Sequence, residues 1–139
     1  MAIANGILDG MGYPISTKAM FLTKALNQIK SLLPLLGGEE HTITTLSGFG
    51  DLILTCMSEK SRNFSFGKMI GERKSKEEIM TYRNQTTIEG LYTLESFKRL
   101  CEIKRIDFPF LSFLESILNG EKDPDALISY LMNHKSKEV

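Results

Sequence analysis

Apolar residues recur every three or four positions along much of the chain, which is the spacing of one face of an α-helix. The longest such run contains Ala19, Leu22, Leu26, Ile29, Leu33 and Leu36. Ser16 is placed to be the N-cap of this helix. Pro34 removes one backbone hydrogen bond and predicts a bend in the last turn. Gly37 and Gly38 predict its end.

Four further segments show the same spacing. They cover residues 75–82, 91–101, 108–118 and 123–132. Ser75 and Glu78 have the pattern of a capping box. Asp123 followed by Pro124 has the pattern of an N-cap with proline at the first helical position. Only residues 85–88 indicate extended structure, so the sequence predicts an all-α fold.

The beginning of the chain predicts a helix that packs closely against another. Residues 2–11 are small and apolar, and Gly6 and Gly10 lie four positions apart. A chain of 139 residues is long enough for one buried core but too short for two enzyme domains. We therefore expect one multi-helix domain over residues 1–133, followed by a frayed polar tail over residues 134–139.

The composition of the chain argues against several classes of function. The formal net charge is zero, which argues against a nucleic-acid or anionic-membrane partner. The basic run 60–76 has six cationic side chains against one glutamate and is typical of a solvated helix face. The chain shows neither a signal peptide nor an apolar run near the roughly 20 residues of a membrane span. Cys56 and Cys101 lie far apart, as reduced thiols of a cytoplasmic protein would. No cluster has metal-ligand spacing, so no metal site is expected.

The tripeptide Ser61-Arg62-Asn63 has the chemistry of a phosphate site. A phosphate dianion is bound best by a guanidinium, hydroxyl and amide donors, and the free N–H groups at a helix N-terminus. Ser61 or Asn63 would cap the helix that follows and place Arg62 beside its positive end. The alternative is an ordinary N-cap with one solvated arginine, and the spacing alone favours this alternative.

A carboxylate and a hydroxyl precede this tripeptide by one short helix. Asp51 lies between Phe49-Gly50 and an apolar run, where an unpaired charge is costly. It therefore either caps a helix, pairs with a cation or binds a ligand hydroxyl. Thr55 follows one helical turn later on the same side. Its hydroxyl either joins Asp51 at a site or bonds back to the helix backbone.

Three segments together resemble the C-terminal, substrate domain of bacterial-type NAD(P)-dependent glycerol-3-phosphate dehydrogenases. They are residues 2–10, residues 46–63 with their Gly-Phe-Gly-Asp-Leu, Thr-Cys and Ser-Arg-Asn motifs, and Thr87-Ile-Glu-Gly90. The resemblance runs from Met1 to about Met132. It implies an all-α fold like the C-terminal domain of 6-phosphogluconate dehydrogenase. It also implies reduction of dihydroxyacetone phosphate to sn-glycerol 3-phosphate with NADH or NADPH, for phospholipid synthesis.

By this resemblance, Asp51 would help to bind the glycerol moiety or orient a catalytic lysine. Ser61, Arg62 and Asn63 would contact the substrate, with Arg62 also near the dinucleotide. Thr87 and Glu89 would lie at the edge of the NAD or NADP site, although Thr87 replaces the family's usual valine.

The resemblance also shows what the chain lacks. The family's catalytic lysine falls three positions before Met1, and its Rossmann domain falls further upstream. We therefore expect no catalytic residue in this chain and no turnover by the chain alone, because donor, acceptor and acid must be held together. The family's Gly-x-Asn pattern is also lost around residues 13–16. A homodimer is a further expectation. The alternative function is a helical dimerisation or partner-binding module without catalysis.

Overall fold

The computed structural model describes residues 1–133, apart from the side chains of residues 46 and 47. Within them the α-helices are α1 (Ala2–Gly10), α2 (Ile15–Leu32), α3 (Asp51–Met57), α4 (Arg62–Gly71), α5 (Lys76–Gln85), α6 (Glu89–Lys104), α7 (Phe110–Leu118) and α8 (Ala126–Asn133). Shorter turns are η1 (Pro34–Leu36), η2 (Glu40–Thr44) and η3 (Leu46–Gly50). No strand occurs in this part of the chain, which confirms the all-α prediction. The predicted frayed tail, residues 134–139, lies outside the described residues.

Helix α1 lies at the centre and packs directly on α4, as its glycine spacing predicts. A Cβ added at Gly6 would lie 2.1 Å from the Phe64 carbonyl oxygen, and one added at Gly67 would lie 1.9 Å from the Ile3 carbonyl oxygen. Side chains at these positions would therefore force the helices apart. The glycines allow the two backbones to touch.

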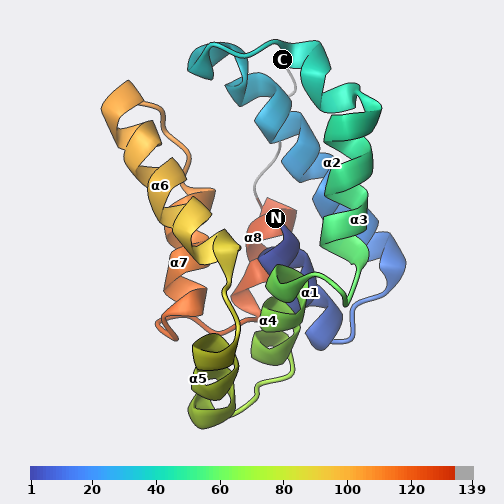
Figure 1. The fold of residues 1–139 in the computed structure, drawn as a ribbon, viewed down its shortest axis with the longest axis vertical. Helices are drawn as coiled ribbons and strands as arrows, with labels where there is room; N and C mark the ends of the chain where they lie inside the picture. The colour runs from blue at the N-terminus through green and yellow to red at the C-terminus, as the bar shows by residue number, and fades with distance from the viewer. Residues whose placement is uncertain (134–139) are drawn as a thin grey trace.

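The core forms around α1 where α2, α7 and α8 meet it. Ile7, Leu8, Phe21 and Leu127 are fully or almost fully buried. The ring of Phe21 lies 6.1 Å from that of Phe110, centroid to centroid. Figure 1 shows α6 and α7 on one side of the molecule and α2 and α3 on the other, with the N-terminus between them. This arrangement frames the candidate site.

The ends of α2 differ from the prediction. The helix begins at Ile15 after Pro14, and not after Ser16. The Pro14 carbonyl accepts the first bonds, from the N–H groups of Thr17 and Lys18. At the other end the α-helix stops at Leu32 and Pro34 opens a 3₁₀ turn. Leu33 itself keeps the α conformation, but Pro34 has no N–H to donate to the carbonyl four residues earlier, so the α-helical hydrogen bonds end there and the chain continues as a 3₁₀ turn.

Two of the other predicted caps, at Ser75 and at Asp123, have different outcomes. Ser75 and Glu78 form both bonds of the capping box, which confirms that prediction. Helix α8, in contrast, begins only at Ala126. Asp123 instead accepts a hydrogen bond from the Asp125 N–H at 2.9 Å and forms a bidentate pair with Arg73. The aspartate therefore caps a turn, and Pro124 lies in that turn.

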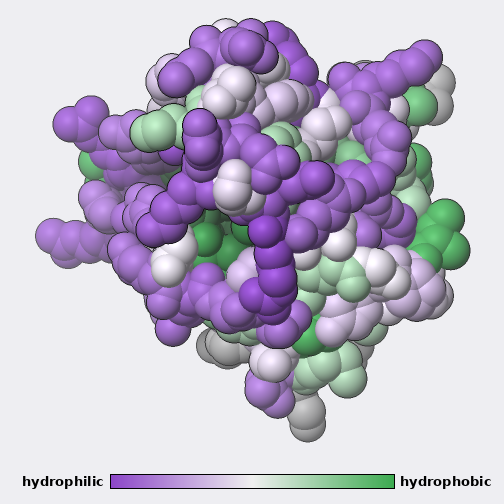
Figure 2. All heavy atoms as spheres, turned by 90° about the horizontal axis from the view of Figure 1, so that it is seen from below, coloured by the Kyte–Doolittle hydropathy of each residue, from purple (hydrophilic) through white to green (hydrophobic). Residues whose placement is uncertain are grey.

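The basic run 60–76 is largely neutralised by ion pairs. Acidic partners lie within 4 Å of Arg62, Lys68, Arg73 and Lys74. Seen from below, the end of the molecule where α5 lies is mainly hydrophilic, with hydrophobic residues only in small patches (Figure 2). Within residues 1–133 no helix is both long and apolar enough to span a bilayer.

Candidate functional site

An open cavity of about 610 Å³ lies between α2 and α3 on one side and α6 and α7 on the other. Residues 1–3 contribute to its lining, together with Leu114 of α7. Apolar walls come from Ile29, Leu52, Leu94 and Phe97. Its polar lining comes from side chains of Gln28, Asp51, Thr55, Asn63, Glu89 and Thr93.

Asp51 and Thr55 lie on this cavity, one helical turn apart on α3. Both are exposed. The sequence argument from desolvation is therefore wrong for Asp51, because its apolar neighbours along the chain do not bury it. Asp51 is the first residue of α3 and directly follows the π-helical turn η3. Neither side chain has a hydrogen-bond partner among the described residues, so the second alternative for Thr55, a bond back to the helix backbone, is not formed.

The N-terminus of α4 is joined to the N-terminus of α6 by two side chains. Ser61 is the N-cap of α4, and its hydroxyl accepts the Phe64 N–H at 3.3 Å. The Asn63 side-chain oxygen accepts the Gly90 N–H at 2.8 Å. Arg62 donates to the Glu89 carboxylate at 2.9 Å. Two motifs 27 residues apart in sequence therefore meet at one place.

The structure brings together most, but not all, of the residues that the sequence singles out. Asp51, Thr55, Asn63 and Glu89 line the cavity, and Arg62 reaches its rim through Glu89. The Ser61 hydroxyl is engaged in the helix cap. Thr87 instead lines a second hollow of about 630 Å³, together with residues of α5 and α6 that include Arg83 and Tyr92.

The sequence profile described as "NAD-dependent glycerol-3-phosphate dehydrogenase C-terminus" matches residues 1–129. The chain belongs to this family. It is 37% identical over 138 residues to the glycerol-3-phosphate dehydrogenase (NAD(P)+) of Chlorobium phaeobacteroides strain BS1, and 37% identical over 137 residues to that of Staphylococcus carnosus strain TM300. Each match covers 99% of this chain and 41% of the relative.

A solved structure gives the same result for the fold. The crystal structure of the glycerol-3-phosphate dehydrogenase from Coxiella burnetii matches with a TM-score of 0.84 and 34% identity. The match covers 96% of this chain and 41% of that one. The chain thus spans about two-fifths of the length of the glycerol-3-phosphate dehydrogenases that it matches.

Sequence reasoning missed three residues of the cavity. Gly90 was seen only as part of a motif, yet a Cβ there would lie 2.7 Å from the Asn63 side-chain oxygen that its own N–H binds. Gln28 comes from α2, and nothing in its sequence surroundings connects it with the site. Thr93 follows Glu89 by four positions, and that spacing is a signal that would have found it.

Cys56 also lines the cavity, but its environment does not favour reactivity. The thiol is 1% exposed, and burial raises its pKa. A raised pKa disfavours the nucleophilic thiolate. Cys56 and Cys101 are both free, as their separation in the sequence predicts, and both are buried. No group of three or more metal-ligating side chains is present among residues 1–133.

Proposed function

We propose that this chain is the substrate-binding part of a glycerol-3-phosphate dehydrogenase, which interconverts dihydroxyacetone phosphate and sn-glycerol 3-phosphate. The observation that carries the proposal is the meeting of the Ser61–Asn63 and Glu89–Gly90 segments at one cavity that also holds Asp51. The family membership supports it, because relatives of the chain are named for this activity.

The chemistry of the cavity suits a small phosphorylated polyol. Arg62 and the first N–H groups of α4 offer positive charge and donors to a phosphate at a helix N-terminus. Asp51 and Thr55 offer an acceptor and a hydroxyl without other partners among the described residues, as polyol hydroxyls require. Phosphate at α4 and hydroxyls at α3 would place the ligand across the cavity mouth.

NAD or NADP would supply or accept the hydride in the complete enzyme. Among residues of this chain, Arg62 and Glu89 fit its edge, because both are more than half exposed and lie at the cavity rim. Thr87 remains a prediction, since it lines a different hollow. By the resemblance, the catalytic lysine would precede Met1 by three positions, and Met1 lines the cavity. We expect no turnover from residues 1–139 alone. Oxidation of NADH by the chain in the presence of dihydroxyacetone phosphate would contradict this.

Calorimetric titrations with three ligands test the proposal. We expect sn-glycerol 3-phosphate to bind with a dissociation constant of about 1 mM, equivalent to about −4 kcal/mol. Inorganic phosphate and glycerol should each bind at least fivefold more weakly, because each engages only half of the site. Equal affinity for inorganic phosphate would reduce the site to a simple anion site and contradict the assignment of Asp51 and Thr55.

We further propose that the protein is cytoplasmic and forms a homodimer. Exposed apolar side chains on α3 and α6 support self-association, because Leu54 is 70% exposed and Ile103 is 71% exposed. The same feature would serve the alternative, a partner-binding helical module. Sedimentation equilibrium with and without sn-glycerol 3-phosphate separates them. A dimer that does not respond to the ligand and shows no heat of binding would favour the module.

A further inference from the structure

We propose that Asp9 and Lys68 are positioning residues that hold the α3–α4 connection, residues 58–61, and through it the substrate-binding tripeptide Ser61–Asn63. The inference rests on the proposed function. It assigns a role to a cluster of charges whose residues do not line the cavity.

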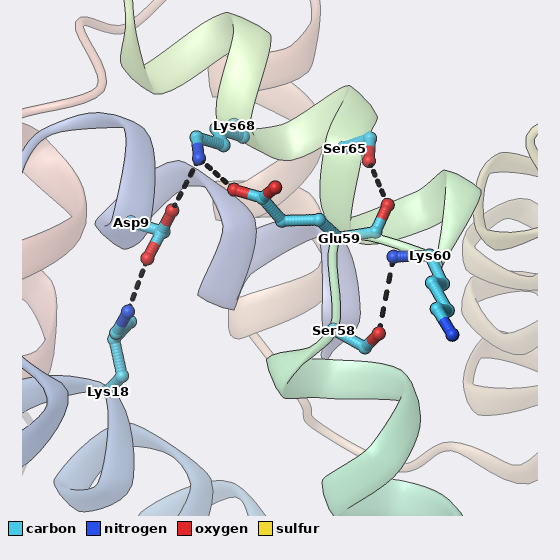
Figure 3. A network of polar contacts seen from close by, with 7 residues as sticks. All are labelled: Asp9, Lys18, Ser58, Glu59, Lys60, Ser65 and Lys68. Carbon is cyan, nitrogen blue, oxygen red and sulfur yellow. Dashed lines mark hydrogen bonds and ion pairs between the residues drawn. The ribbon is translucent and has the colours of Figure 1, made fainter.

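The cluster joins three helices to the connection (Figure 3). Lys68 of α4 lies between two carboxylates, 3.2 Å from Asp9 of α1 and in a closer ion pair with Glu59 of the connection. Asp9 also pairs with Lys18 of α2. The central residues are the better shielded ones, because the side chain of Asp9 is 20% exposed and that of Lys68 is 30% exposed, against 71% for Glu59. One ammonium group therefore ties the exposed connection to the central helix.

A second contact from α1 holds the start of the same segment. The amide nitrogen of Asn5, which is fully buried, donates to the Cys56 carbonyl oxygen at 2.6 Å. This carbonyl lies in the last turn of α3, where the helix offers it no partner. Asn5 and Asp9 lie four residues apart on α1, so one face of α1 fixes both the end of α3 and, through Lys68, the connection.

Hydrogen bonds within the connection link these contacts with α1 to the substrate-binding tripeptide. The Ser65 hydroxyl donates to the Glu59 carbonyl at 2.8 Å, and the Ser61 N–H donates to the Ser58 carbonyl at 2.9 Å. Ser61 then caps α4, and Asn63 holds α6 through Gly90. The tripeptide thus lies between anchors to α1 on one side and to α6 on the other. Loss of the Lys68 anchor should leave the fold in place but loosen the tripeptide.

The charges of the cluster support one another. Burial raises the pKa of Asp9, but the hydrogen bonds and charges of Lys18 and Lys68 outweigh it, so the pKa is lowered overall. Hydrogen bonds to Glu59 and Asp9 raise the pKa of Lys68. The lowered pKa of Asp9 and the raised pKa of Lys68 keep both of these groups charged across the neutral range, so their ion pair does not depend on a change of protonation there.

The test compares Lys68→Met with two other variants of the 139-residue chain. Methionine keeps the stem of the side chain and removes the charge. Lys68→Arg restores a cation that can reach both carboxylates. Lys98→Met is the matched control, because Lys98 pairs with Glu115 across α6 and α7, away from the connection, with its side chain 33% exposed. Three quantities are measured on each: the melting temperature, amide hydrogen exchange at Phe64 and Gly90, and the dissociation constant for sn-glycerol 3-phosphate.

We expect Lys68→Met to speed exchange of both amides about tenfold and to weaken ligand binding about tenfold. Lys98→Met should lower the melting temperature by a similar amount but change the exchange rates and the dissociation constant by less than twofold. Lys68→Arg should restore most of the protection from exchange and most of the affinity. Exchange in Lys68→Met that stays within twofold of the unsubstituted chain overturns the inference. An equal increase in the exchange rates of Phe64 and Gly90 in Lys98→Met also overturns it. The exchange result decides the inference even if the unsubstituted chain binds no ligand, an outcome that would instead count against the proposed function.

Discussion

Replacing Gly67 with alanine would place a methyl carbon 1.9 Å from the Ile3 carbonyl oxygen, about 1.5 Å short of an ordinary van der Waals contact at 3.4 Å. The methyl group meets backbone, which cannot rotate away, so α1 and α4 must separate. Overpacking of this kind costs about 3 kcal/mol at the upper end of its usual range. Replacing glycine with alanine within a helix stabilises the helix by about 1 kcal/mol, which offsets part of this loss. The net loss is about 2 kcal/mol, which lowers the melting temperature by roughly 6–10 °C for a domain of this size.

Thermal and urea unfolding followed by circular dichroism measure this loss. Asn27→Ala is the control, because Asn27 is exposed on α2 and the substitution changes helix propensity without a clash. We expect it to leave the melting temperature unchanged or slightly raised. A Gly67→Ala chain that melts within 2 °C of the unsubstituted protein would refute the backbone contact between α1 and α4. Because α4 begins with the substrate tripeptide, the same variant should also bind sn-glycerol 3-phosphate more weakly.

Three further predictions concern charge and hydrogen bonding. Glu89→Gln frees Arg62 from an exposed ion pair worth about 0.2–1 kcal/mol and removes a negative charge near the phosphate. We therefore expect sn-glycerol 3-phosphate to bind about two- to tenfold more tightly, as measured by calorimetry. Weaker binding would count against Arg62 as the phosphate ligand. Asn63→Ala leaves the Gly90 N–H without its partner, and its amide exchange should accelerate at least tenfold; unchanged exchange would show that the bond is not formed in solution. The Arg73 guanidinium holds the pKa of Asp123 at about 2, so this pair stabilises the fold above pH 4 and loses that contribution as the pH falls toward 2. In Arg73→Met the carboxyl titration of Asp123, followed by NMR, should move back toward 3.8, and a midpoint still near 2 would contradict the pairing.

Local patterns in the sequence predicted most of the helices and the caps at Ser61 and Ser75. The capping box at Ser75 and Glu78 depends on residues three apart, and the side shared by Asp51 and Thr55 depends on one helical turn. Such features are fixed by the geometry of the helix itself. Prediction failed where a proline acts on its neighbours. Pro34 ended α2 early because it has no N–H for the next α-helical hydrogen bond, and a 3₁₀ turn follows in place of the bent last turn.

The tertiary part of the site had no local signal. The ion pair between Arg62 and Glu89 joins positions 27 residues apart. In the sequence, only the resemblance to a known family indicates that these two motifs belong to one site. The exposure of Asp51 depends on the open space between α3 and α6, which its apolar neighbours in sequence do not reveal. Asn5 looked like one polar residue in a small, apolar helix, and its contact with Cys56 appears only when α1 and α3 are packed together.

The most direct test of the account is a backbone amide NMR titration of the 139-residue chain with sn-glycerol 3-phosphate, with Arg62→Ala alongside. The account predicts shifts that saturate in the millimolar range and cluster at Asp51, Thr55 and residues 61–63. It also predicts that Arg62→Ala abolishes them while its spectrum stays that of a folded protein. Shifts that cluster elsewhere, persist in Arg62→Ala, or fail to appear at about 20 mM ligand in a folded sample would contradict it.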